Sequence, residues 1–249
     1  MPEAWINDSG VRRLTPDSAE WPSALNDLGA RMPGELWVSG PSLEVSGAVA
    51  VTGSRACSGY GSLVAAQLGM DLACSGRTVV SGASLGIESA VSRGVMAEHG
   101  GRLVVVLACG IDLTYPARSE ALLAEARRSH TVVSPFPLGT APCRLGFEFR
   151  GLVLAALGAG LVVVEAEMGS GSLAMAREAR ELGRAVMAVP GPVASNLSRG
   201  TNSLIRHGAG LVEGCAQVLE RLEASGTARR LVHAGPNPAA PHFSERIEY

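Results

Sequence analysis

The 249-residue sequence contains no lysine, and all 21 of its basic residues are arginine. A Walker-type phosphate-binding loop and Schiff-base chemistry both need a lysine side chain, so the composition excludes these two kinds of site. Aromatic residues make up only 4% of the chain, which limits how many nucleic-acid bases could stack on it. With 23 acidic residues the formal net charge is −2, so a polyanionic partner would need a local arginine patch.

The sequence also lacks a long hydrophobic run. The longest one, 152–164, has 13 residues and includes two glycines, whereas a membrane-spanning helix needs about 20 residues. The N-terminal residues show no basic start followed by an apolar stretch, which predicts that there is no secretory signal. The five cysteines form no C-x-x-C pair, so we expect neither a disulfide framework nor a zinc site. Together these features predict a cytoplasmic protein without membrane contact, metal or cofactor.

Hydrophobic residues make up 47% of the chain and follow a regular alternation. Short β-branched runs alternate with alanine- and leucine-rich stretches of helical period. The runs are apolar throughout, which is typical of parallel strands buried on both faces. The pattern predicts an α/β fold, an extended Rossmann-like and doubly wound sheet that is mostly parallel. The expected strands are 49–52, 78–81, 103–107, 131–134, 161–165, 185–189 and 210–212, and the expected helices are 60–75, 86–99, 119–128, 147–157, 172–182, 201–207 and 216–223.

Three segments are predicted along the chain. Residues 1–45 form a short N-terminal lead-in, of which 1–20 are expected to be irregular. Residues 46–224 form the Rossmann-like domain. From Ser225 the composition becomes polar and proline-rich, so 225–249 are predicted to be a flexible tail.

Loops rich in glycine and serine follow three of the predicted strands, at 53–55, 82–86 and 169–172. Ligands bind beyond the carboxyl ends of the strands in such sheets. Small residues let backbone N–H groups approach a phosphate, and the dipole of the next helix favours an anion. We therefore predict a phosphate-bearing ligand, although the glycines could simply form tight turns. The candidate residues are Gly53, Ser54, Arg55, Gly82, Gly86, Gly169, Ser170, Gly171 and Ser172.

The segment 142–150 is the best candidate for contact with nucleic-acid bases. It interleaves Arg144 and Arg150 with Phe147 and Phe149, and this combination offers guanidinium groups for the backbone and rings for stacking. An amphipathic helix with core phenylalanines is the alternative interpretation.

No catalytic residue is predicted. The five histidines are scattered, and none stands near a serine or cysteine in a nucleophile context. Asp112 and Glu165 could act as acids, or they could cap helices and pair with arginine. The G-x-G-x-x-A sequence at 169–174 has no acidic residue about 20 positions further on, so it is a weak signal for a dinucleotide.

Several short blocks, taken in order, resemble the DNA-processing protein A family (DprA/Smf) over roughly residues 21–213. After a lead-in at 21–40, the first is V-T-G-S-R at 51–55, followed by Ser58, Tyr60 and Gly61. The second is L-A-C-G at 107–110, followed by Asp112 and Y-P at 115–116. Further blocks lie at 163–166, 170–173, 183–184, 188–191 and 198–209.

The resemblance implies an extended Rossmann fold, a homodimer and binding of single-stranded DNA without sequence preference. It also implies a recombination mediator without enzymatic activity, which protects the DNA and loads a RecA-type recombinase in DNA uptake, transformation and recombination. It assigns phosphate binding to Gly53, Ser54, Arg55 and Ser58, and it places Phe147 and Arg150 beside the DNA-binding pocket.

Some positions depart from the family pattern. The family's S-G-x-A-R-G-I-D-x-x-A-H reads S-G-A-S-L-G-I-E-S-A-V-S at 81–92, so Leu85 replaces an arginine and Glu88 an aspartate. The family's F-P-x-R-N-R reads F-E-F-R-G-L at 147–152, so Leu152 replaces the final arginine. These changes predict weakened DNA binding or a pocket that holds another ligand.

Two other functions therefore stay open. One is a sensor whose pocket binds a small nucleotide. The other is a phosphoribohydrolase of the LOG-like type, although the loop 168–172 lacks the glutamate that this group carries after its glycine-rich motif. The chain also ends before the winged-helix domain of many relatives, which predicts a short member of the family.

Overall fold

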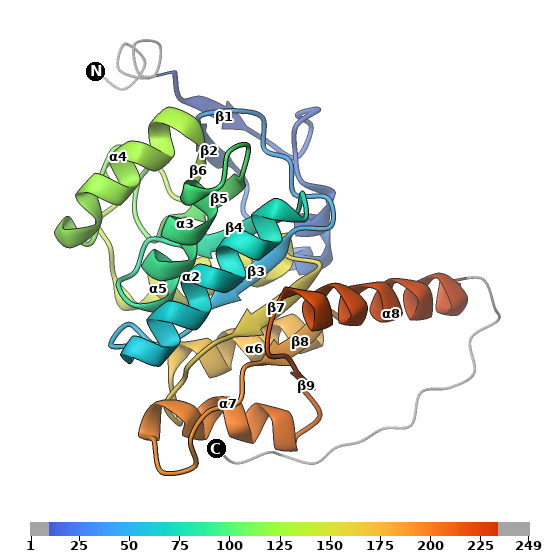
Figure 1. The fold of residues 1–249 in the computed structure, drawn as a ribbon. Coiled ribbons are helices and arrows are strands. Elements are labelled where there is room, and N and C mark those ends of the chain that lie inside the picture. Colours follow the sequence, from blue (N-terminus) through green and yellow to red (C-terminus); the bar gives the residue numbers. More distant parts are fainter. Residues whose placement is uncertain (1–9, 234–249) are drawn as a thin grey trace.

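A mixed sheet of nine strands forms the centre of the molecule (Figure 1). The computed structural model describes residues 10–233, with side chains to residue 226. In spatial order the strands are β1-β2-β6-β5-β4-β3-β7-β8-β9. All seven from β6 to β9 run parallel, whereas β1 and β2 are antiparallel additions at one edge. The strands are β1 Arg12–Leu14, β2 Leu36–Ser39, β3 Val49–Thr52, β4 Thr78–Gly82, β5 Arg102–Val106, β6 Thr131–Ser134, β7 Gly160–Val163, β8 Ala185–Ala188 and β9 Gly210–Leu211.

Helices cover both faces of this sheet, and each face has its own apolar core. One face packs against α2 (Gly59–Cys74), α3 (Ile87–Ala97), α4 (Glu120–Ser129) and the start of α8 (Cys215–His233). In Figure 1, α2 and α3 cross in front of the strands. The other face packs against η1 (Ser23–Arg31), α5 (Arg144–Leu157), α6 (Gly171–Glu181) and α7 (Asn196–Arg206). A further short helix, η2 (Ala117–Ser119), precedes α4.

The predicted α/β class, with its doubly wound and mostly parallel sheet, is confirmed. The core strands are buried along nearly their whole length, which explains why their sequences are apolar rather than alternating. Most predicted elements agree with the structure to within a few residues. Along residues 10–233, no helix combines the length and hydrophobicity that crossing a membrane requires.

The expectation for the two ends of the chain was less accurate. Residues 12–14, expected to be irregular, instead form β1, which pairs with β2, and β2 in turn pairs with β6 of the central sheet. A short polar strand such as β1 gains its order from a neighbouring strand rather than from its own pattern. At the other end, α8 continues past Ser225 to His233, so helix takes up the start of the segment predicted as a tail. Residues 1–9 and 234–249 lie outside the described residues.

Candidate nucleic-acid interface

The three glycine-rich loops lie side by side at the carboxyl edge of the sheet, because they follow the adjacent strands β4, β3 and β7. The backbone N–H of Ser54 donates to the carbonyl oxygen of Glu165 at 2.7 Å. The N–H of Ile87 donates to the carbonyl oxygen of Ser54 at 3.1 Å. After β6 the chain crosses back to place β7 on the far side of β3, so these loops surround the point where the strand order reverses. Ligands of doubly wound folds bind at this point.

Two of the predicted glycines are needed for these loops to touch. A Cβ on Gly53 would lie 2.7 Å from Cγ1 of Ile87, and one on Gly86 would lie 2.3 Å from the carbonyl oxygen of Ser54. Gly86 also has a φ of +76°, a conformation that favours glycine. By contrast, a Cβ on Gly169 or Gly171 would meet nothing within 4 Å, which leaves the start of α6 open to a ligand.

Phe147, in the first turn of α5, contacts residues from two other segments of the chain. The guanidinium carbon of Arg55 lies 4.5 Å from the centroid of the Phe147 ring. Tyr115, which is 44% exposed, meets the same ring edge-on, with 5.8 Å between the ring centroids. Arg55 is exposed and forms no ion pair with any residue of the described part of the chain. The fold thus brings together the arginine of one predicted site and the phenylalanine of the other.

Arg150 faces the interior, although the sequence predicts a contact with the nucleic-acid backbone. Its Nη1 donates to Oε1 of Glu88 at 2.6 Å, and the two side chains are 6% and 3% exposed. Glu88 also accepts a hydrogen bond from the hydroxyl of Thr52 at 3.1 Å and one from the N–H of Ser84 at 3.0 Å. Burial raises the pKa of the Glu88 carboxyl, but the charge and hydrogen bonds of Arg150 outweigh it and leave that pKa lowered.

The remaining predicted polar residues have varied surroundings. Ser58 caps α2 through its contact with the N–H of Gly61. The hydroxyl of Ser170 is buried and lacks a hydrogen-bond partner within residues 10–233, and Ser172 is buried in the first turn of α6. Arg144 is 92% exposed and pairs with Glu148 one turn later, at 3.0 Å. Of these four side chains, only Arg144 points freely into solvent.

Two candidate acids have structural hydrogen bonds instead. Both carboxylate oxygens of Asp112 accept from the N–H of Gly139, and Glu165 accepts from Ser58. The leucine at 152 is part of the core, so the residue in place of the family's arginine does not reach the surface. Sequence reasoning did not list Tyr115 or Glu88 as site residues, although both stand in the blocks that resemble the family.

The fold and this edge define an α/β protein of the doubly wound class, in which an arginine–aromatic cluster lies beside three glycine-rich loops. Residues 12–223 match the family model described as DNA recombination-mediator protein A, and the chain therefore belongs to this family.

Individual relatives agree with this assignment. A relative from Mycobacterium tuberculosis is 42% identical over 224 residues, which cover 85% of this chain and 57% of the relative. DNA processing protein DprA of Streptococcus pneumoniae is 36% identical over 175 residues, covering 70% of this chain and 61% of that protein. Protein Smf of Escherichia coli is 34% identical over 221 residues, covering 88% and 59%. The chain thus spans less than two thirds of the length of these relatives.

Two solved structures share the fold. The X-ray structure of DprA from Streptococcus pneumoniae superposes with a TM-score of 0.80 at 30% identity, covering 88% of this chain and 78% of that one. DNA processing protein A from Helicobacter pylori superposes with a TM-score of 0.72 at 22% identity, covering 88% and 96%. The second structure was described for its mode of binding single-stranded DNA.

Proposed function

We propose that this protein binds single-stranded DNA, without sequence preference, at the edge formed by Phe147 and the loops after β3, β4 and β7. The observation that carries the proposal is the stack of Arg55 on Phe147 at 4.5 Å, which presents a cation and an aromatic ring together. Stacking of a base on an aromatic side chain contributes about 1–3 kcal/mol and accepts any base. An adjacent guanidinium can hold the phosphate that follows the base.

The open start of α6 offers a second place for the DNA backbone. Nothing stands within 4 Å of a Cβ built on Gly169 or Gly171, so a phosphate could approach the backbone N–H groups there. The positive end of the helix dipole favours an anion at this position. Arg144, on the first turn of α5, is exposed enough to contact a further phosphate of the bound DNA strand.

Membership of the recombination-mediator family supports a wider role. As part of the same proposal, the protein is a mediator of recombination and DNA uptake that binds DNA rather than catalysing a reaction. It acts as a homodimer in the cytoplasm and loads a RecA-type recombinase onto the strand that it protects. The description of single-stranded DNA binding by the Helicobacter pylori protein supports the choice of ligand.

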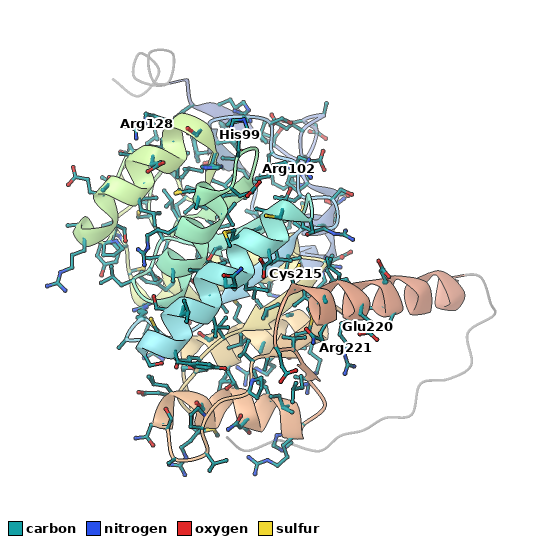
Figure 2. All side chains as sticks on the ribbon, viewed as in Figure 1. His99, Arg102, Arg128, Cys215, Glu220 and Arg221 are labelled. Atoms are coloured by element: carbon teal, nitrogen blue, oxygen red, sulfur yellow. The ribbon has the colours of Figure 1, made fainter. Side chains whose placement is uncertain are left out.

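Fluorescence anisotropy with a labelled, mixed-sequence oligonucleotide at two salt concentrations tests the proposal. We expect binding of the wild type to be salt-sensitive. Arg55→Ala should weaken this binding about tenfold or more and lower the slope of log K against log[salt] by about one. Arg128→Ala is the matched control, because Arg128 is an exposed arginine in the last turn of α4, just before β6 begins and thus at the opposite edge of the sheet (Figure 2).

Absence of binding at low salt by protein shown to be folded would overturn the proposal. Equal losses in Arg55→Ala and Arg128→Ala would overturn the location of the site. In the first case, a thermal shift with small nucleotides would identify a nucleotide sensor instead.

A further inference from the structure

Arg150 and Phe147 lie three residues apart on α5, so their side chains share one side of that helix. The guanidinium carbon of Arg150 is 5.7 Å from the centroid of the Phe147 ring. Arg55 contacts the same ring from the exposed loop after β3. The Phe147 ring therefore contacts both an exposed arginine and a buried one, and only the exposed one is free to meet a ligand.

The partner of the buried arginine connects the other parts of the site. Glu88, on α3, accepts from Thr52 at the end of β3 and from the N–H of Ser84 in the loop after β4. Nη2 of Arg150 is also within 3.4 Å of the Ser84 hydroxyl. The ion pair thus joins the ends of two strands to α5, and these are the elements that carry Arg55, the loop 82–86 and Phe147.

The glycine at position 82 leaves room for this ion pair. A Cβ on Gly82 would lie 2.3 Å from Nη1 of Arg150 and 2.3 Å from Oε2 of Glu88. At the same time the pair is imperfect, because Nε of Arg150 is buried without a partner among the described residues. Buried ion pairs pay a large desolvation cost, and replacing both partners by neutral groups of similar volume is often neutral or stabilising. Stability alone is therefore a weak reason for this arrangement.

We propose that Glu88 and Arg150 form a positioning pair, which holds the Phe147 ring and the loop 82–86 in their binding arrangement and does not itself contact DNA. The inference rests on the proposed function, since it assigns a role within the same site. Because Glu88 neutralises Arg150, the pair adds no phosphate contact. Phosphate contacts near Phe147 then fall to Arg55.

The double variant Glu88→Gln/Arg150→Met tests this role, because it removes both charges and leaves neither partner buried alone. Single variants would leave an uncompensated buried charge and unfold more easily. We expect the folded double variant to bind the labelled oligonucleotide about tenfold more weakly, with the salt slope of the wild type. The matched control is Glu20→Gln/Arg12→Met, which removes an ion pair of the same 2.6 Å length between β1 and the segment that follows it.

A spectroscopic readout follows the ring without any DNA. Phe147→Trp is introduced into the wild type and the double variant, and each spectrum is corrected with that of its own parent. We expect the added tryptophan to be quenched more readily by acrylamide in the double variant, because the ring has lost the arginine that fixes it. A pair with only a structural role would leave this quenching unchanged.

Three outcomes would overturn the inference: wild-type affinity in the double variant, unchanged quenching of the added tryptophan, or a salt slope lowered by about one. The last would mean that Arg150 contacts a phosphate directly. Failure of the wild type to bind DNA would instead overturn the proposed function, and the quenching experiment would still test the positioning role. If the double variant does not fold, Glu88→Asp takes its place, with a smaller loss of affinity, an unchanged slope and increased quenching expected.

Discussion

Glu165, just beyond β7, accepts two hydrogen bonds from Ser58, the residue that caps α2. Its carboxylate oxygens lie 2.9 Å from the backbone nitrogen and 2.6 Å from the hydroxyl oxygen of Ser58. Glu165 is buried, and a Cβ on Gly61 would lie 2.2 Å from its Oε2. The contact ties the loop after β3 to the loop after β7, so it holds together the two sides of the point where the strand order reverses.

This contact predicts a loss of stability in two variants. Ser58→Ala removes the cap of α2 together with one bond to Glu165, and we expect it to cost about 1–2 kcal/mol. Glu165→Gln weakens two charge-assisted hydrogen bonds and should cost about 1–3 kcal/mol. Urea unfolding measures both. Ser62→Ala is the control, because the Ser62 hydroxyl has no hydrogen-bond partner within the described residues. A loss as large in Ser62→Ala would contradict the role of the cap.

Close packing of α2 on α3 predicts that Gly94→Ala is destabilising. A Cβ at position 94 would lie 1.9 Å from the carbonyl oxygen of Ala66, a backbone atom that cannot rotate away. Overpacking of this kind typically costs about 1–3 kcal/mol, and chemical denaturation would measure it. Gly59→Ala is the matched control at the start of α2, where a Cβ would meet nothing within 4 Å. There we expect no loss, since alanine is the better helix former; similar effects at both positions would count against the packing argument.

The buried pair of Glu88 and Arg150 predicts a specific dependence of stability on pH. The pKa of Glu88 is lowered in the folded protein, so its contribution is fully present above the unfolded value of about 4.3. The contribution is lost as the pH falls below that value and through the folded pKa. Urea unfolding at several pH values should therefore show that acidification below about pH 4.3 reduces the stability of the wild type more than that of Glu88→Gln/Arg150→Met.

The comparison isolates this pair because other acidic groups occur in both proteins. The pKa of Glu20, for example, is lowered mainly by its hydrogen bond to Arg12, and that effect cancels between wild type and variant. Parallel stability curves in acid would show that the folded protein does not hold Glu88 in its charged form.

The aromatic contact predicts that DNA binding depends on an aromatic ring at position 147. Phe147→Ala should weaken binding of the labelled oligonucleotide by about 1–3 kcal/mol, because a base loses its stacking surface. Phe147→Tyr keeps that surface and should bind nearly as the wild type does. Anisotropy with both variants, after circular dichroism has shown that they fold, checks this. Equal losses in both variants would argue against stacking.

The parallel core of the fold follows directly from the pattern of apolar residues. β-Branched runs that are apolar on both sides can only be buried on both faces, and helices of the right length separate them. From that alternation it also followed that the three glycine-rich loops share one edge, and the structure places them on the adjacent strands β4, β3 and β7. Two of the family blocks, 51–55 and 163–166, lie at the ends of β3 and β7 and so belong to the same edge.

The direction in which the side chains of the candidate site face depends on packing between distant segments. Arg144 and Arg150 look alike in the sequence, yet one is exposed and the other is buried against Glu88. The rotation of α5 about its axis determines which arginine is buried. That rotation is set by packing against the sheet and α6 and not by the local sequence. The same reason applies to β1 and β2, whose order comes from pairing with strands distant in the chain. Contacts between distant segments form the cluster around Phe147, and local sequence patterns do not predict such contacts.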